Sequence, residues 1–172
     1  MDRPTHTDPE LTPEYAAWLD RVTATFDAVS YTCRVRLRDP EAAAAVALRV
    51  ATGLVSRPAV FRHWGLPYSG RIAKLAEDGI ADAAAGRLAP HGSWAGFRAA
   101  LGEVTPEHQE TLVLACGEGL DTDALAAHWA CGVDEATTRR AGTIAHLKEL
   151  AVHHGDSGPD PRGRTDIEDE GR

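Results

Sequence analysis

The segment EGLDTDALAAHWACGVDEATTRRAG, residues 118–142, has the pattern of two short helices joined by a tight turn. The spacing predicts that the second helix begins at Asp134 and carries Arg139 and Arg140 on its first turns. Such a pair suits a helix-turn-helix that places its second helix in the major groove of DNA. It equally suits two helices that only pack together, so the rest of the chain has to separate the alternatives.

Helical patterns extend over most of the remaining sequence. Thr12-Pro13, Asp39-Pro40 and Thr105-Pro106 each place a capping residue before a proline, which is typical of a helix start. Apolar residues then recur at spacings of three and four, and no useful length of chain alternates with the period of a strand. The sequence therefore predicts an all-α fold. The side chains expected on inward faces are Tyr15, Trp18, Leu19, Val22, Phe26, Val29, Val46, Val50, Leu54, Ile72, Leu75, Ala76, Ile80, Trp94, Phe97 and Leu101.

Glycine and proline divide the chain into two small helical modules. GRLAPHGS, residues 86–93, is the best candidate for a linker between them. The first module is predicted over 13–85, and the second, which is helix-turn-helix-like, over 94–153. Residues 154–172 are acidic and almost free of apolar side chains, so we predict a disordered C-terminal tail.

Composition and charge narrow the class of protein. No apolar run approaches the roughly 20 residues that a membrane-spanning helix needs, and the acidic, proline-rich start has no apolar core of the kind found in a secretory signal. The cysteines are odd in number and widely spaced, which argues against a disulfide framework. We therefore expect a cytoplasmic protein with no membrane partner. The three cysteines are Cys33, Cys116 and Cys131.

The net charge of −8 is distributed unevenly. Residues 13–102 sum to +3 and residues 103–153 to −6, with histidine taken as neutral. Affinity for nucleic acid depends on Lys and Arg near the phosphates, so the acidic C-terminal half is not expected to bind DNA unaided.

The motifs of the C-terminal half follow one another in a recognisable order. An opening at 105–107 precedes an apolar triplet at 112–114, a Glu-Gly-Leu turn at 118–120, the apolar pair 125–126 and the second motif helix from Asp134. This order resembles the promoter −35 domain of small sigma factors of the extracytoplasmic-function type, within the sigma-70 family. The Ala-rich stretch 36–64 resembles, more weakly, the polymerase-binding and −10 domain of the same family. Together the two matches cover most of residues 13–151.

The resemblance implies a transcription regulator that acts with RNA polymerase and promoter DNA, without catalysis or a cofactor. It places base-edge and phosphate contacts near the start of the second motif helix, with Arg139 suited to guanine and Thr138 or Arg140 to phosphate. The alternative is a sigma-derived adaptor that binds a protein partner and no longer binds DNA. The candidate DNA-binding residues are Glu135, Thr137, Thr138, Arg139 and Arg140.

Two other groups are candidates for partner binding. One is the alternating run of arginines at the end of the first helix, and the other is the aromatic and histidine cluster of HWGLPYSG, residues 63–70. Cys116, His128 and Cys131 are residue types that bind metals, but the spacing of four zinc ligands is missing, so we predict no metal site. No catalytic motif is found, and we predict no enzymatic activity. The candidate partner-binding residues are Arg34, Arg36, Arg38, His63, Trp64 and Tyr68.

Overall fold

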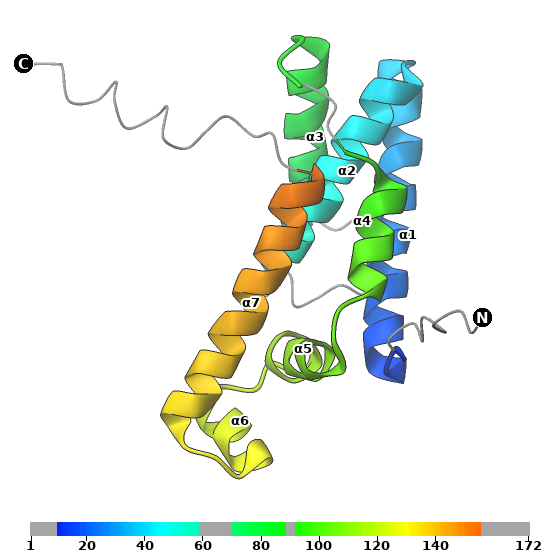
Figure 1. The fold of residues 1–172 in the computed structure, drawn as a ribbon. Coiled ribbons are helices and arrows are strands. Elements are labelled where there is room, and N and C mark those ends of the chain that lie inside the picture. The colour runs from blue at the N-terminus through cyan, green and yellow to red at the C-terminus, as the bar shows by residue number, and fades with distance from the viewer. Residues whose placement is uncertain (1–9, 59–69, 89–91, 156–172) are drawn as a thin grey trace, which may run out of the picture.

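Residues 10–58, 70–88 and 92–155 are described by a computed structural model of the chain (Figure 1). They form helices and no strand, which confirms the all-α prediction. The elements are α1 (Pro13–Leu37), α2 (Pro40–Ser56), α3 (Gly70–Ala84), α4 (Trp94–Gly102), α5 (Pro106–Leu112), the π-helical turn η1 (Val113–Gly117), α6 (Thr122–Trp129) and α7 (Val133–Gly155).

The predicted helix starts are confirmed at all three proline positions. The Thr12 hydroxyl accepts a hydrogen bond from the Tyr15 amide at 3.3 Å, and the Asp39 carboxylate accepts one from the amide of Glu41 at 3.0 Å. These bonds satisfy amides that have no partner inside the helix. α5 also begins at its proline, although the side chain of Thr105 makes no capping bond.

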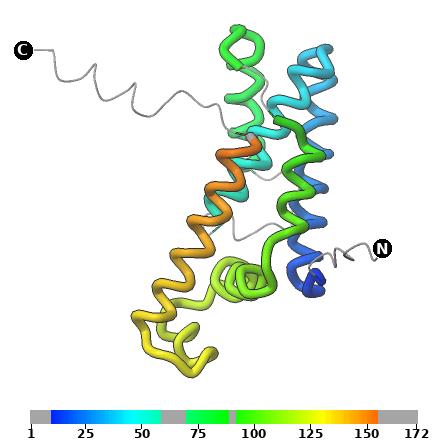
Figure 2. The backbone as a smooth tube through the Cα atoms, viewed as in Figure 1, coloured from blue at the N-terminus to red at the C-terminus, as the bar shows by residue number. Residues whose placement is uncertain are grey.

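The helices are arranged around α2. α1 and α2 form an antiparallel hairpin, α3 packs against both, and α7 runs along α2 from the α5–α6 end of the molecule towards α3 (Figures 1 and 2). α4 lies beside α1, where the rings of Phe26 and Trp94 stack with their centroids 4.2 Å apart. The C-terminal helix thus contacts elements from the beginning and the middle of the chain.

Two apolar clusters form the core. One lies between α1, α2 and α3. The other draws on α1, α2, α4, α5, η1, α6 and α7, so it includes residues on both sides of the predicted linker. The module boundaries 13–85 and 94–153 stay a prediction.

The predicted inward faces are confirmed with one exception. Leu75 is 37% exposed, although we expected it in the core. The buried stripe of α3 consists of Ile72, Ala76, Gly79 and Ile80, and Leu75 lies about 85° around the helix from its centre. α3 approaches α2 so closely at Gly79 that an added Cβ would lie 2.8 Å from a Val46 methyl carbon, so a narrow face suffices for packing.

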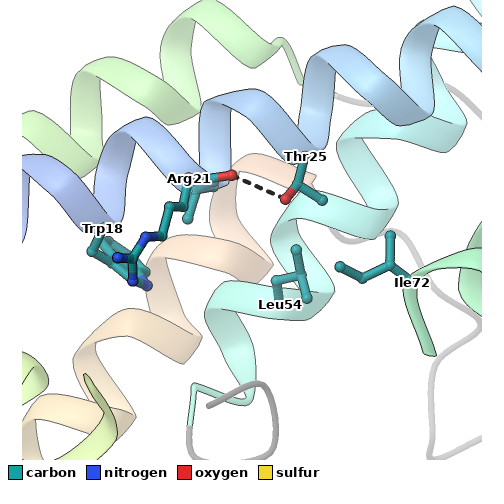
Figure 3. Close-up of a pocket in the computed structure, with 6 residues that line it drawn as sticks. Trp18, Arg21, Thr25, Leu54 and Ile72 are labelled. Atoms are coloured by element: carbon teal, nitrogen blue, oxygen red, sulfur yellow. Dashed lines mark hydrogen bonds between the residues drawn. The ribbon is translucent and has the colours of Figure 1, made fainter. Parts of the chain in front are cut away.

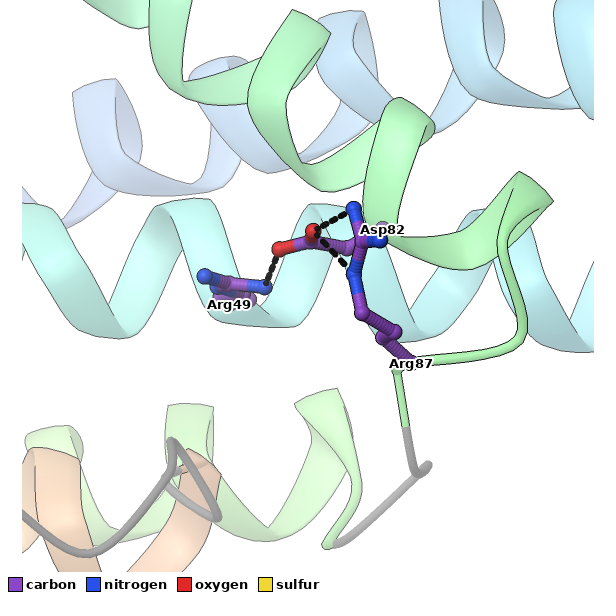
Figure 4. Close-up of polar contacts among 3 residues, drawn as sticks. All are labelled: Arg49, Asp82 and Arg87. Carbon is purple, nitrogen blue, oxygen red and sulfur yellow. Dashed lines mark hydrogen bonds and ion pairs between the residues drawn. The ribbon is translucent and has the colours of Figure 1, made fainter. Parts of the chain in front are cut away.

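Ionic contacts fasten the end of α3 to α2. The Asp82 carboxylate accepts a hydrogen bond from Arg49 of α2 at 2.8 Å, and two from Arg87, just beyond α3, at 3.0 and 3.2 Å (Figure 4). The hydrogen bonds from Arg49 and Arg87 hold the pKa of Asp82 below its usual range. This carboxylate therefore joins α2 to the segment that leads towards α4.

None of the helices in the described part of the chain combines the length and hydropathy of a bilayer-spanning helix. Residues 154 and 155, which we predicted to begin the disordered tail, are instead the last residues of α7, because the His154 ring packs near Phe97. From residue 156 on, the predicted tail lies outside the described residues, as do residues 89–91 of the predicted linker.

Candidate functional site

The segment quoted at the outset folds into α6, a short turn and the start of α7. Asp121 caps α6 by accepting a hydrogen bond from the Ala124 amide at 2.8 Å. α6 ends at Trp129, and its capping residue Ala130 has a left-handed conformation (φ 51°) and donates its amide to carbonyls of the last turn. That conformation costs a residue with a Cβ roughly 1 kcal/mol more than it costs glycine. α7 then begins at Val133, one residue before the predicted start.

The first turns of α7 present three of the predicted DNA-binding side chains to solvent. Glu135, Thr137 and Thr138 are exposed, whereas Ala136 between them is buried against the core. The Thr137 and Thr138 hydroxyls donate to the carbonyls one turn earlier, at 2.8 and 3.0 Å. Each hydroxyl oxygen keeps a free lone pair and remains able to accept a hydrogen bond.

Arg139 lies differently from these three residues. Its guanidinium carbon is 3.9 Å from the ring centroid of Trp129, the last residue of α6. Its Nε lies 3.7 Å from a carboxylate oxygen of Glu107 on α5, and the side chain is only 27% exposed. This predicted guanine contact is therefore engaged inside the protein. Its neighbour Arg140 is half-buried and forms no ion pair with any residue that the structure describes.

A second glutamate of α5 extends this arrangement. Glu110 accepts a hydrogen bond from the Trp129 indole nitrogen at 3.2 Å, and its carboxylate lies 3.5 Å from Nε2 of His128. We call Glu107, Glu110, His128, Trp129 and Arg139 the Arg139 cluster. It ties the first helix of the motif to α5 and α7, and it places two carboxylates beside the candidate DNA-binding surface.

Sequence patterns gave no indication of a second cluster, between α5 and α7. The His108 and His146 rings stack with centroids 4.8 Å apart and planes inclined by 14°. Nδ1 of His108 lies 2.7 Å from the hydroxyl of the buried Thr143. Burial, and secondarily the nearby His146, lower the pKa of His108, while the Glu107 carboxylate acts in the opposite direction. Thr143 and His146 are three residues apart on one helix, but their meeting with His108 depends on tertiary packing.

The predicted partner-binding arginines do not form one group. Arg36 pairs with Glu77 of α3 through two hydrogen bonds, at 2.8 and 3.2 Å, and this pairing lowers the pKa of Glu77. Arg34 and Arg38 are exposed and form no ion pair with any other residue that the structure describes. The remaining candidates, His63, Trp64 and Tyr68, lie outside the described residues.

A small pocket between α1, α2 and α3 has mainly apolar walls (Figure 3). The Thr25 hydroxyl in its wall donates to the Arg21 carbonyl at 2.9 Å, so this polar group is already engaged. Its empty volume is about 260 Å³, part of which is open solvent. The lining residues are Trp18, Arg21, Val22, Thr25, Leu54 and Ile72.

The cysteines lie in separate environments. Cys33 and Cys116 are buried and Cys131 is partly exposed, and burial raises the pKa of the Cys33 thiol to about 11. Within the residues that the structure describes, no three His, Cys, Asp or Glu side chains gather in a way that would hold a metal ion.

No family model, curated protein or solved structure matches this chain.

Proposed function

We propose that this protein is a sigma-factor-like transcription regulator that acts with RNA polymerase and contacts promoter DNA through the start of α7. The observation that carries the proposal is the exposure of Glu135, Thr137 and Thr138 on the first turns of a helix that follows α6 after a short turn. The N-terminal turns of the second helix are where a helix-turn-helix contacts base edges. The order of sequence motifs in the same region supports the proposal independently.

The charges around this surface make polymerase a necessary part of the proposal. Residues 103–153 carry a net charge of −6, and Arg139 is held against Trp129 and Glu107. Arg140 is then the cation on the first two turns that is free of ion pairs with described residues. One arginine gives little affinity for phosphates, so the polymerase supplies most of the binding energy and α7 adds selectivity.

The test is promoter binding measured with and without polymerase from the source organism, at two salt concentrations. Arg140→Ala is expected to weaken polymerase-dependent binding several-fold and to flatten its salt dependence, because a phosphate contact is lost. Lys148→Ala is the matched control, since this exposed cation lies two turns further along the same helix. Absence of promoter binding by the native protein with polymerase at low salt would refute the proposal.

The Arg139 cluster favours a second candidate function, a helical adaptor that binds a protein partner and not DNA. Because Arg139 stacks on Trp129 and faces Glu107, it holds helices together and is not free to bind phosphate. The surface around it is then largely acidic. A pull-down from native lysate distinguishes the two functions. Polymerase subunits among the captured proteins support the regulator, and an unrelated dominant partner supports the adaptor.

A further inference from the structure

One exposed stripe of α1 combines apolar and cationic side chains. Tyr31 is 67% exposed and Val35 is 61% exposed, which makes them the two most exposed large apolar side chains in the described part of the chain. They are four residues apart and therefore lie on the same side of the helix, together with Arg34 and the capping residue Arg38. We call these four residues the α1 stripe.

The two arginines of the α1 stripe are available to a ligand. Neither forms an ion pair with another residue that the structure describes, whereas Arg36 lies on a different side of α1 and is engaged with Glu77. The two guanidinium charges exceed the partial negative charge at the end of the helix. The stripe therefore suits a short segment that carries an apolar side chain next to several carboxylates.

The chain itself contains such a segment. Residues 165–170 read TDIEDE, with four carboxylates, and Ile167 is the one large apolar residue between 156 and 172. We infer that residues 165–170 dock on the α1 stripe, with Ile167 against Tyr31 and Val35 and the following carboxylates near the two arginines.

The length of the chain permits this contact. α7 ends beside α4, where the ring centroids of His154 and Phe97 lie 6.1 Å apart. The Trp94 ring of α4 in turn stacks on Phe26 of α1. From there to Tyr31 is five residues of helix, about 7.5 Å. The ring contacts, with the 6.1 Å between the Phe97 and Trp94 centroids included, and the rise along α1 cover roughly 24 Å. Passing around α1, which is about 10–12 Å across, adds roughly 13 Å, while the twelve residues from Gly155 to Ile167 span up to about 40 Å.

A spin label on the C-terminal segment tests the docking in the full-length chain. In a Cys131→Ser background, which removes the partly exposed thiol, the label is attached at Gly171→Cys and, as a control, at Ser157→Cys. The label at 171 is expected to enhance the relaxation of the backbone amides of residues 31–38 about twofold or more over other exposed helical amides. The effect should largely disappear in 1 M salt, where the Debye length is about 3 Å.

Charge reversals make the test specific. Glu168→Lys with Asp169→Lys is expected to abolish the enhancement without affecting the helices, and Arg34→Glu with Arg38→Glu should do the same. Arg71→Glu with Lys148→Glu, which changes two exposed cations elsewhere, is the matched control and should leave the enhancement in place. If the α1 substitutions disturb the helical part of the protein, the variant with the two substitutions in residues 165–170 alone decides whether this segment docks on the α1 stripe.

Two results overturn the inference. One is an enhancement at residues 31–38 that is no larger than elsewhere on the surface, or that survives both tail substitutions. The other is an enhancement seen only between molecules, when isotope-labelled chains without the spin label are mixed with spin-labelled chains. That result would assign the α1 stripe to a second copy of the protein.

Discussion

Replacing Arg139 by alanine tests whether this arginine holds the helices of the motif together. Its guanidinium lies 3.9 Å from the Trp129 ring centroid and is only partly exposed, and such a cation–π contact contributes about 0.5–1 kcal/mol, or more when desolvated. The Glu107 carboxylate, whose side chain is 70% exposed, adds little at 3.7 Å. We therefore expect Arg139→Ala to lower the free energy of unfolding by about 1 kcal/mol, or the Tm by roughly 2–4 °C.

The measurement is urea unfolding followed by far-UV circular dichroism. Arg140→Ala provides the matched control, because the neighbouring arginine forms no comparable contact with the described residues, and it should change stability by less than about 0.5 kcal/mol. A double-mutant cycle with Trp129→Ala should give a coupling energy of about 0.5–1 kcal/mol. Equal effects of the two arginine substitutions, or a coupling energy near zero, would show that the Trp129 contact does not stabilise the fold.

Three further predictions concern buried contacts, each checked by urea unfolding. Because the pKa of His108 is lowered in the folded state, the unfolded chain binds the proton more readily. Stability should thus fall as the pH drops below about 6.5, and less steeply in His108→Gln. Gly79→Ala should destabilise by about 1 kcal/mol net, because its clash with the stiff Val46 side chain outweighs the gain in helix preference. Adding Val46→Ala should remove the clash. Tyr15→Phe should cost about 1–3 kcal/mol, because the buried hydroxyl donates to a carbonyl of α4.

Each of these predictions has an opposite outcome that would contradict it. An unchanged pH slope in His108→Gln would mean that His108 does not couple folding to proton binding. A stabilised Gly79→Ala chain would mean that α2 and α3 separate readily at this point. Tyr15→Phe as stable as the native chain would place the partner carbonyl in contact with water.

Helix starts and inward faces were predictable from the sequence because each depends on residues that lie close together in the chain. A capping residue followed by proline located the starts of α1, α2 and α5, and most of the side chains that three- and four-residue spacing placed on inward faces are buried. The period of a helix does not show how wide its buried face is. Leu75 was therefore assigned to the core, whereas close approach at Gly79 leaves it at the edge.

The contacts around the candidate site were not predictable in the same way. Arg139 was expected to be free for DNA, because a sequence does not show that Trp129 and Glu107 come from two other helices to meet it. The stacking of His108 on His146 joins residues 38 positions apart and depends on the packing of α5 against α7. The π-helical turn after α5 likewise follows no pattern that was identified in the sequence.

The length of α7 has a mechanical consequence for any molecule that binds at its first turns. Its 23 residues form a rod about 34 Å long, which begins beside α6 and ends beside α4, with α2 packed along its C-terminal part. A tilt of about 10° at the α6 end would carry the other end through roughly 6 Å. A close-packed interior does not absorb a displacement of that size gradually. Binding at the first turns of α7 would therefore act as a lever on the hairpin of α1 and α2.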